Sequence, residues 1–203
     1  FDRWQVAGVS VEKVLVIATD VKSRFINKDD VSTAILFGDG AGAVVLVKGE
    51  HGIQDIQIGA DGAYHELVHL PGGGACLPLT GTSLKEGRHF MRMEGIRLFR
   101  VAVRKMESAL TDFLKQNHLS VHEIDFFIFH HANLRILEAL FQRVEIPMHK
   151  TELTLSKFGN TSSSSIPIAL NTAVEAGKLK QGDLVLLSAF GGGITWGNIL
   201  LKW

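Results

Sequence analysis

Residues 184–201 read LVLLSAFGGGITWGNILL and form the most apolar stretch of the chain. This stretch is about as long as a membrane-spanning helix, which needs about 20 apolar residues. However, Gly191–Gly193 divide it into two short runs of β-type residues, and the charged residues Asp183 and Lys202 stand at its ends. Apolar runs joined by glycines are typical of a hairpin. We therefore expect a buried β-hairpin rather than a membrane span.

The segments that precede the hairpin alternate between strand and helix patterns. Strands are predicted at 124–129 and 153–155, and a helix should follow Asn133, which is placed to cap it. The longest helical pattern runs from about 92 to 117, and another helix should end at Gly177. The apolar residues expected to face inward are Ile96, Phe99, Val103, Met106, Leu110 and Phe113 in the longest helix, and Leu134, Leu137, Phe141 and Val144 in the helix after Asn133. The order βαβαββ predicts an α/β fold with a mixed sheet covered by helices.

The N-terminal quarter has the pattern of several short strands. The apolar run 14–18 is typical of a strand buried on both faces. Further strands are predicted at 33–37 and 43–47, and the glycine-rich run 38–42 between them should form a tight turn. A phosphate-binding loop is excluded there, because the dinucleotide fingerprint needs a helix after its glycines. An alternating strand at 53–58 begins a second unit.

Composition excludes several classes of protein. The 203 residues are 46% hydrophobic and 21% charged, which is typical of a globular chain rather than a disordered one. Twenty-one basic residues balance 21 acidic ones, so no net charge attracts nucleic acid or an anionic membrane. The single cysteine, Cys76, excludes a disulfide framework and a cysteine-rich metal site, and its surroundings favour an incidental or structural role. We expect a soluble, intracellular, enzyme-like domain.

The loop-rich stretch 61–89 contains the sequence His65-Glu66-Leu67-Val68-His69. This matches the zinc-peptidase pattern, in which two histidines one helical turn apart hold zinc and the glutamate activates water. His89 or Glu86 would have to supply a distant third ligand, and Pro71 ends any helix directly after the motif. The alternative is a solvated loop, which the high false-positive rate of short motifs favours.

Three loops should each lie at the C-terminal end of an apolar strand, and each carries a different hydrogen-bond donor. They are 130–133 with its histidines, 158–162 with an asparagine, and 189–193 with its glycines. Ligands in α/β folds collect at the carboxyl ends of strands, so these loops should converge. Taken singly, each loop has a purely structural explanation: a half-buried histidine in the first, a helix-capping asparagine in the second and a flexible glycine loop in the third. Together they predict a site that stabilises negative charge on a carbonyl oxygen.

Four motifs resemble one known family. They are ILFGDGAGAVVL from Ile35, HHANLRI from His130, FGNTSSSSIPIAL from Phe158 and GDLVLLSAFGGGITWGNILL from Gly182. They resemble β-ketoacyl-acyl carrier protein synthase III, a condensing enzyme with a thiolase-like fold. The resemblance implies decarboxylative Claisen condensation of an acyl thioester with malonyl-acyl carrier protein, the step that initiates fatty-acid synthesis.

The resemblance also implies a division of the chain. Residues 1–50 resemble the tail of the N-terminal thiolase-like half, and residues 51–203 resemble the C-terminal half. The nucleophilic cysteine of the family lies upstream of Phe1, and 1–8 resemble the end of the helix that it opens. We therefore expect the fragment alone to be unable to condense.

The remaining site residues follow from the resemblance. It implies that His130 and Asn160 are the catalytic partners of the missing cysteine, and that Gly192 supplies the oxyanion-hole amide. His131 stands where the family usually has glutamine, and Val31 stands where well-known members have an arginine that stacks on the adenine of coenzyme A. The positions that should line the substrate tunnel are Gly95, Phe99 and Phe190.

The implied partners are acyl carrier protein, acyl and malonyl thioesters, and a second copy of the intact enzyme in a cytoplasmic homodimer. No cofactor, resident metal, nucleic acid or membrane is expected. Since carrier proteins are acidic, docking should use local positive charge. The residues expected to contact the carrier are Arg97, Arg100, His131, Ala132, Asn133, Leu134, Arg135 and Arg143, with Arg104 on the same helix face as Arg97 and Arg100. The alternatives are a related acyltransferase of secondary metabolism, a non-catalytic partner subunit of a synthase, and the zinc peptidase.

Overall fold

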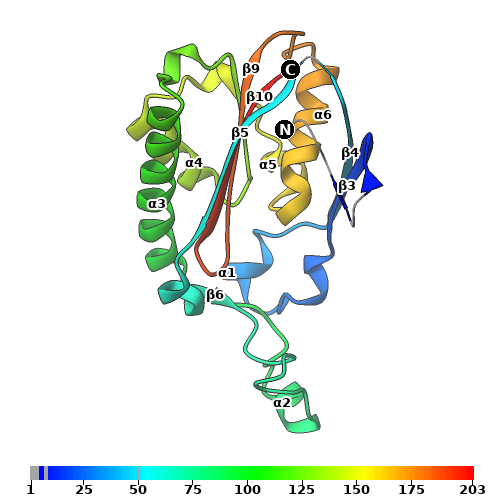
Figure 1. The fold of residues 1–203 in the computed structure, drawn as a ribbon. Coiled ribbons are helices and arrows are strands. Elements are labelled where there is room, and N and C mark those ends of the chain that lie inside the picture. The colour runs from blue at the N-terminus through cyan, green and yellow to red at the C-terminus, as the bar shows by residue number, and fades with distance from the viewer. Residues whose placement is uncertain (1–4, 7–8, 50) are drawn as a thin grey trace.

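The computed structural model describes residues 5–6, 9–49 and 51–203. Figure 1 shows them arranged in successive layers. Helices α3 (Gly95–Gln116) and α4 (Leu134–Val144) cover one face of a four-stranded sheet, and α6 (Ser165–Glu175) covers the other. A ribbon of β3 (Lys13–Asp20) and β4 (Gly40–Val47) lies beyond α6. The helical cover on both faces is the arrangement that the sequence pattern predicts.

The main sheet is mixed. Its strand order is β5 (Gly52–Ala60), β10 (Thr195–Lys202), β9 (Leu184–Gly191) and β8 (Phe126–Phe129). Strands β8 and β9 are parallel, whereas β10 runs antiparallel to both of its neighbours. The apolar stretch 184–201 is thus the expected hairpin. Among the described residues no helix has the length and apolarity to cross a membrane.

The largest cluster of buried side chains lies between the sheet and the two helices that cover it, α3 and α4. Phe129 of β8 packs against Phe141 of α4 with ring centroids 5.0 Å apart. Two residues expected to face inward do not: Ile96 is 77% exposed and Leu134 is 41% exposed. Both lie in the first turn of their helices, where the residues two positions further on are buried instead. The predicted inward residues that are buried are Val103, Met106, Leu110, Phe113, Leu137 and Phe141.

Residues 40–42 of the glycine-rich run 38–42 belong to a strand rather than to the expected turn. Gly40 and Gly42 lie in β4, which pairs with β3 along its whole length. A Cβ atom on Gly40 would come within 2.6 Å of Ser164 Oγ, and one on Gly42 within 2.7 Å of Pro167 Cγ. The glycines therefore let the start of α6 and the turn before it approach the strand closely.

Strand β3 contains the run 14–18, but the prediction that it is buried on both faces is wrong. Leu15 is 60% exposed and Ile17 is 63% exposed. The β3–β4 ribbon packs against α6 through one face only, and no described residue covers the other. The apolar run is strand-forming, but it does not lie in the middle of a layered core.

Two predicted strands are absent from the described structure. Helix α1 (Val31–Ala34) takes the first two residues of the strand expected at 33–37, and a turn follows at 35–36; Asp30 caps the helix by accepting a hydrogen bond from Ser32 N–H. Helix α5 (Leu155–Phe158) begins where the strand at 153–155 was expected. The first segment keeps an isolated bridge between Phe37 and Asn160, and near the second the bridge between Thr151 and Phe127 lies two residues before the predicted strand.

The other elements are short connections. Of the helix end expected at 1–8, residues 1–4 and 7–8 lie outside the described residues, and Gln5–Val6 forms strand β1, paired with β2 (Val9–Ser10). Helix α2 (Gly81–Lys85) lies at the tip of a segment that projects from the body in Figure 1. The rest are β6 (Val68–His69), β7 (Arg92–Met93) and the 3₁₀ turns η1 (Lys22–Arg24), η2 (Gly62–Leu67), η3 (Val121–Glu123), η4 (Met148–Lys150) and η5 (Ser162–Ser164).

Candidate active site

A pocket of about 560 Å³ opens where the carboxyl ends of β8 and β9 meet. Because these strands are parallel, His130, directly after β8, and Gly192, directly after β9, lie at the same edge of the sheet. Asn160 reaches the pocket from the turn that precedes α6. The structure thus brings together the three residues that the sequence singles out. The apolar part of the wall includes Leu36, Phe37, Val68, Met91, Met93, Leu98, Phe99, Ile136, Ile166, Phe190 and Trp196.

The His130 side chain is held in a fixed orientation at the pocket. Its backbone N–H donates to Ser188 O of β9 at 2.8 Å, and its Nδ1 lies 2.7 Å from the Ser165 hydroxyl oxygen. Burial, and secondarily the neighbouring His131, lowers the pKa of His130 to about 4. The imidazole is therefore neutral at physiological pH and carries one ring proton. A neutral imidazole can donate that proton in a hydrogen bond without bringing a charge to the site.

Because the pKa of His130 is lowered on folding, we expect the free energy of unfolding to depend on pH. The ordinary pKa of histidine is 6.5, so between pH 6.5 and about 4 the unfolded chain binds a proton that folded His130 does not. The free energy of unfolding should therefore be highest above pH 6.5 and fall as the pH is lowered through this window. Urea denaturation at several pH values should show a smaller loss in a His130→Asn variant. The same pH dependence in both proteins would contradict the low pKa.

Asn160 is nearly buried and its amide is oriented by the turn around it. Its Oδ1 accepts from Ser162 N–H at 2.9 Å, and its Nδ2 donates one hydrogen to Ala132 O at 3.2 Å. The second Nδ2 hydrogen is free of these bonds. Ser162 has φ of 57°, in the left-handed region that residues other than glycine and asparagine seldom adopt. The strained turn aims the Asn160 amide at the loop that carries His130.

His131 does not reach the surface, so the structure removes it from the residues expected to contact a carrier protein. It is fully buried, with Nε2 3.1 Å from Glu152 O and Nδ1 3.1 Å from Thr154 Oγ1. These contacts satisfy both ring nitrogens when Nε2–H donates to the carbonyl and the Thr154 hydroxyl donates to Nδ1. Burial lowers the pKa of His131, so it too is neutral near pH 7. Its effect on the site is to hold the 130–133 loop and to disfavour a charge on His130.

The other predicted pocket residues are placed as follows. Gly192 is exposed on the pocket wall, and its N–H donates to none of the described residues. Phe190 lies beside His130 with ring centroids 6.5 Å apart. Gly95 and Phe99, at the start of α3, form part of the wall. Gly192 N–H therefore remains available to a ligand atom in the pocket.

Lys22 also lines the pocket, and sequence reasoning missed it. Its Nζ lies 3.2 Å from Asp20, which also accepts hydrogen bonds from the Ser163 side chain and N–H. Partial burial alone would raise the pKa of Asp20, but these hydrogen bonds outweigh it and lower the pKa to about 2. The hydrogen bonds from Ser163 to Asp20 join the end of β3 to the turn that carries Asn160, and Lys22 pairs with the same carboxylate. The only local signal was the Thr19-Asp20 ending of an apolar run.

The zinc-peptidase prediction is wrong for this structure. His65 lies in the 3₁₀ turn η2 and His69 in strand β6, so they are not one α-helical turn apart. Their Nδ1 atoms contact the carbonyl oxygens of Gly62 and Glu66. In the part of the chain that the structure describes, no three His, Cys, Asp or Glu residues are grouped so as to hold a metal ion.

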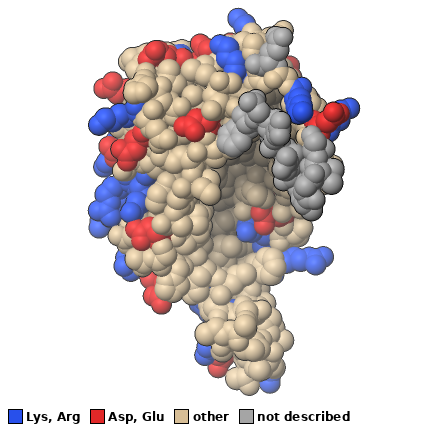
Figure 2. Space-filling model, viewed as in Figure 1, with Lys and Arg blue, Asp and Glu red and all other residues tan. Residues whose placement is uncertain are grey.

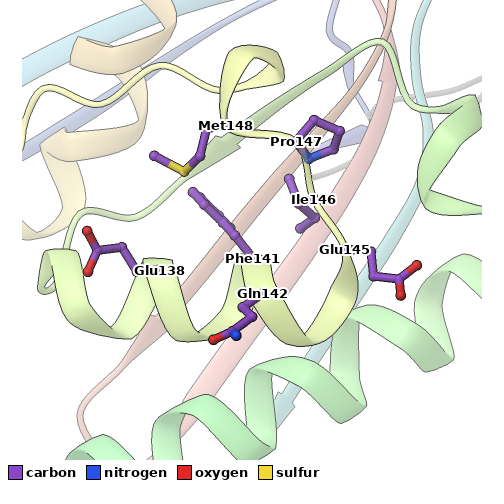
Figure 3. A pocket seen from close by; sticks show the side chains of 7 residues that line it. All are labelled: Glu138, Phe141, Gln142, Glu145, Ile146, Pro147 and Met148. Atoms are coloured by element: carbon purple, nitrogen blue, oxygen red, sulfur yellow. The ribbon is translucent and has the colours of Figure 1, made fainter.

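A second pocket, of about 430 Å³, lies at the C-terminal end of α4 and is separate from the first. Figure 3 shows Phe141, Ile146 and Met148 close to one another, with Glu138, Gln142 and Glu145 around them. It contains no histidine, cysteine or serine, and the only carboxylates that line it are those of the exposed residues Glu138 and Glu145.

Comparison with known proteins decides the family. Residues 5–62 match the sequence profile of 3-oxoacyl-[acyl-carrier-protein (ACP)] synthase III, and residues 114–203 match the profile of its C-terminal part. The chain belongs to this family.

Individual synthase III relatives match nearly the whole chain. β-Ketoacyl-[acyl-carrier-protein] synthase III of Syntrophomonas wolfei is 44% identical over 95% of this chain. The crystal structure of 3-oxoacyl-[acyl-carrier-protein] synthase III from Aquifex aeolicus, 40% identical, superposes with a TM-score of 0.83 over 95% of this chain. In each case the match spans only 58% of the relative's length. These comparisons confirm the thiolase-like α/β fold and the family named from the sequence.

Another similar structure belongs to a polyketide pathway. The priming β-ketosynthase of R1128 biosynthesis is 32% identical to this chain and superposes with a TM-score of 0.83, over 96% of this chain and 58% of that one.

Proposed function

We propose that this chain provides part of the active site of a condensing enzyme, which joins an acyl thioester to malonyl-acyl carrier protein with loss of CO₂ and thereby initiates fatty-acid synthesis. The observation that carries the proposal is the convergence of His130, Asn160 and the Gly192 amide on one pocket. Membership of the synthase III family supports it. In this proposal residues 1–50 belong to the N-terminal thiolase-like half and residues 51–203 form the C-terminal half.

The hard step of such a reaction is loss of CO₂ from the malonyl group, because negative charge develops on the thioester oxygen. Neutral His130 and the free Nδ2 hydrogen of Asn160 can both donate to that oxygen, and neither brings a competing negative charge. The carbanion then attacks the acyl carbonyl, whose oxygen Gly192 N–H would stabilise. Different donors therefore stabilise the malonyl thioester oxygen and the acyl carbonyl oxygen.

The acyl group must be held as a thioester during this attack. Cys76 is exposed and is not among the residues that line the pocket. The residues described here therefore stabilise charge but offer no thiolate for the acyl-transfer step. In the proposal that thiolate comes from the family's N-terminal half.

The direct test is a condensation assay on the protein expressed from its complete reading frame. With an acyl-coenzyme A and malonyl-acyl carrier protein, it should release CO₂ and form a 3-oxoacyl carrier protein in equal amounts. Intact thioesters after prolonged incubation with folded protein would refute the proposed reaction. The same assay on residues 1–203 alone should give no condensation product.

A second candidate is the priming of a secondary-metabolite pathway, and the similarity to the R1128 priming β-ketosynthase favours it. The chemistry at the pocket would be the same, and the acyl group would differ. Comparing acyl primers of different length and branching in the condensation assay separates the two candidates, because a fatty-acid initiator should prefer a short, unbranched primer or one typical of membrane lipids.

The proposed partner is an acidic carrier protein, docked on the side of the pocket where α3 and α4 begin. Arg135 is exposed in the first turn of α4, and its N–H donates to Asn133, which lines the pocket. Arg100 is exposed on α3. Arg143, by contrast, is bound to Glu107 at 2.6 Å, and Figure 2 shows basic and acidic side chains interspersed along the α3 side of the molecule. Local charge near the pocket, rather than a continuous basic face, therefore supports docking.

We expect Arg135→Glu to raise the KM for malonyl-acyl carrier protein about three- to tenfold, because it places a negative charge where the acidic partner approaches. The change should also weaken the salt dependence of KM. Malonyl-pantetheine, which lacks the carrier, should react almost normally. Lys115→Glu, at the opposite end of α3 from the pocket, is the matched control and should have little effect. Equal losses with both substrates would mean that Arg135 shapes the pocket instead.

The proposal also covers the location and the oligomeric state of the whole protein. The intact enzyme is proposed to be a cytoplasmic homodimer, as in the family that it resembles. Sedimentation equilibrium of the protein expressed from its complete reading frame tests this, and a monomer at all accessible concentrations would contradict it.

A further inference from the structure

We propose that Ser165 is a positioning residue for His130: its hydroxyl donates a hydrogen bond to Nδ1 and so keeps the ring proton on Nε2, the nitrogen left for the pocket. The inference rests on the proposed function, because a proton on Nε2 matters only if His130 donates a hydrogen bond to the substrate.

The contact is short and buried. Ser165 is the first residue of α6 and is 1% exposed. Its Oγ lies 2.7 Å from His130 Nδ1, and it also accepts from the backbone N–H of His131 at 3.3 Å. One hydroxyl therefore holds both histidines of the 130–133 loop. His130 Nε2 has no partner among the described residues and is not one of their fully buried polar atoms.

The position of the hydroxyl hydrogen decides the tautomer. A serine hydroxyl has one hydrogen to donate and two lone pairs to accept with. The competing acceptor is Ser162 O, 2.8 Å from Oγ, to which the hydroxyl can also donate; this carbonyl accepts from the backbone N–H of Ser165 as well, so one of its two lone pairs is already used. The hydroxyl makes the one short hydrogen bond to Nδ1 among the described residues, whereas the Ser162 backbone acts on the ring more weakly than burial does. A separation of 2.7 Å is typical of an O–H donor and short for an N–H donor. We assign the hydroxyl hydrogen to Nδ1.

The consequence is a histidine with defined roles for its two nitrogens. With Nδ1 accepting from Ser165, the neutral ring must carry its proton on Nε2. The hydrogen bond made by one ring nitrogen thus sets what the other can do, as it does for histidines that bind metals. If the hydroxyl were lost, the ring would divide between its two tautomers and turn more freely, and only a part of the molecules would present a donor to the pocket.

The test measures the tautomer directly. Protein expressed from its complete reading frame, with ¹⁵N-labelled histidine, is studied near neutral pH by long-range proton–nitrogen correlation of the imidazole rings. We expect the proton on Nε2 in the wild type and a mixture of tautomers in Ser165→Ala. Ser164→Ala is the matched control, because Ser164 is equally buried and donates to Thr161 O without touching His130. A proton on Nδ1 in the wild type would overturn the assignment whether or not any variant folds.

A kinetic measurement separates positioning from a structural role. Ser165→Ala should lower kcat for condensation about tenfold, the loss expected for one hydrogen bond, with little change in KM. Ser165→Thr keeps a hydroxyl and should recover most of the rate and the wild-type tautomer. If the tautomer changes as expected but no protein condenses, the proposed function fails and the role of Ser165 stands. If condensation is normal and the tautomer is unchanged in Ser165→Ala, the role of Ser165 fails and the function stands.

Discussion

Replacing His130 by alanine should reduce kcat for condensation by about 10²–10³, because the reaction then loses one of two donors to the oxygen that becomes negative. The loss should appear in kcat rather than KM, since the hydrogen bond strengthens only as charge develops. The same range is expected for Asn160→Ala. Transfer of the acyl group to the enzyme, which in the proposal uses Gly192 N–H, should be affected much less in either variant.

The measurement is the release of CO₂ from malonyl-acyl carrier protein together with the yield of condensed product. His149→Ala is a suitable control, because His149 is exposed in the turn η4 and is not among the residues that line the pocket. Circular dichroism and urea denaturation show whether each variant is folded. A loss of less than about fivefold in a folded His130→Ala protein would exclude His130 from the charge-stabilising role.

Gly38→Ala should destabilise the protein by about 3 kcal/mol, a large effect for adding one methyl group. A Cβ atom at Gly38 would overlap the carbonyl oxygen of Phe158, which is backbone and cannot move as a side chain could. Relief would require the segment before β4 and the 158–162 loop to separate. That separation would break the hydrogen bond from Gly38 N–H to Asn160 O, now 2.9 Å. Since this bond holds Asn160 in place, catalysis should fall along with stability.

Urea denaturation and the condensation assay measure the two effects of Gly38→Ala. Gly81→Ala is the matched control, because a Cβ atom there meets no atom within 4 Å. A Gly38→Ala protein as stable and as active as the Gly81→Ala protein would show that the loop at Asn160 can move away without cost. It would also contradict the close packing that the structure gives for this glycine.

The elements that the sequence predicts correctly are those with a strong local pattern. Helix α3 has apolar residues at spacings of three and four, α4 begins after Asn133, whose Oδ1 accepts a hydrogen bond from Arg135 N–H, and the final hairpin turns at its glycines. These signals depend on residues within a few positions of one another. The strand predicted at 33–37 is wrong because Asp30 caps a helix that begins at Val31. This cap is also a local signal in the sequence.

The sequence by itself determined the family, the long helices and the final hairpin, and it predicted the three loops that the structure brings to one pocket. Tertiary structure alone decided that His131 is buried, that Lys22 lines the pocket, and that the Ser165 hydroxyl meets His130. His130 and Ser165 are 35 positions apart and belong to a strand end and a helix start, so no spacing in the sequence relates them. Their contact exists because parallel pairing of β8 with β9 sets one edge of the sheet, and the close approach of β4 to Ser164 and Pro167 sets the start of α6 against it. Burial and hydrogen bonding depend on how distant segments pack, and packing is a property of the folded chain as a whole.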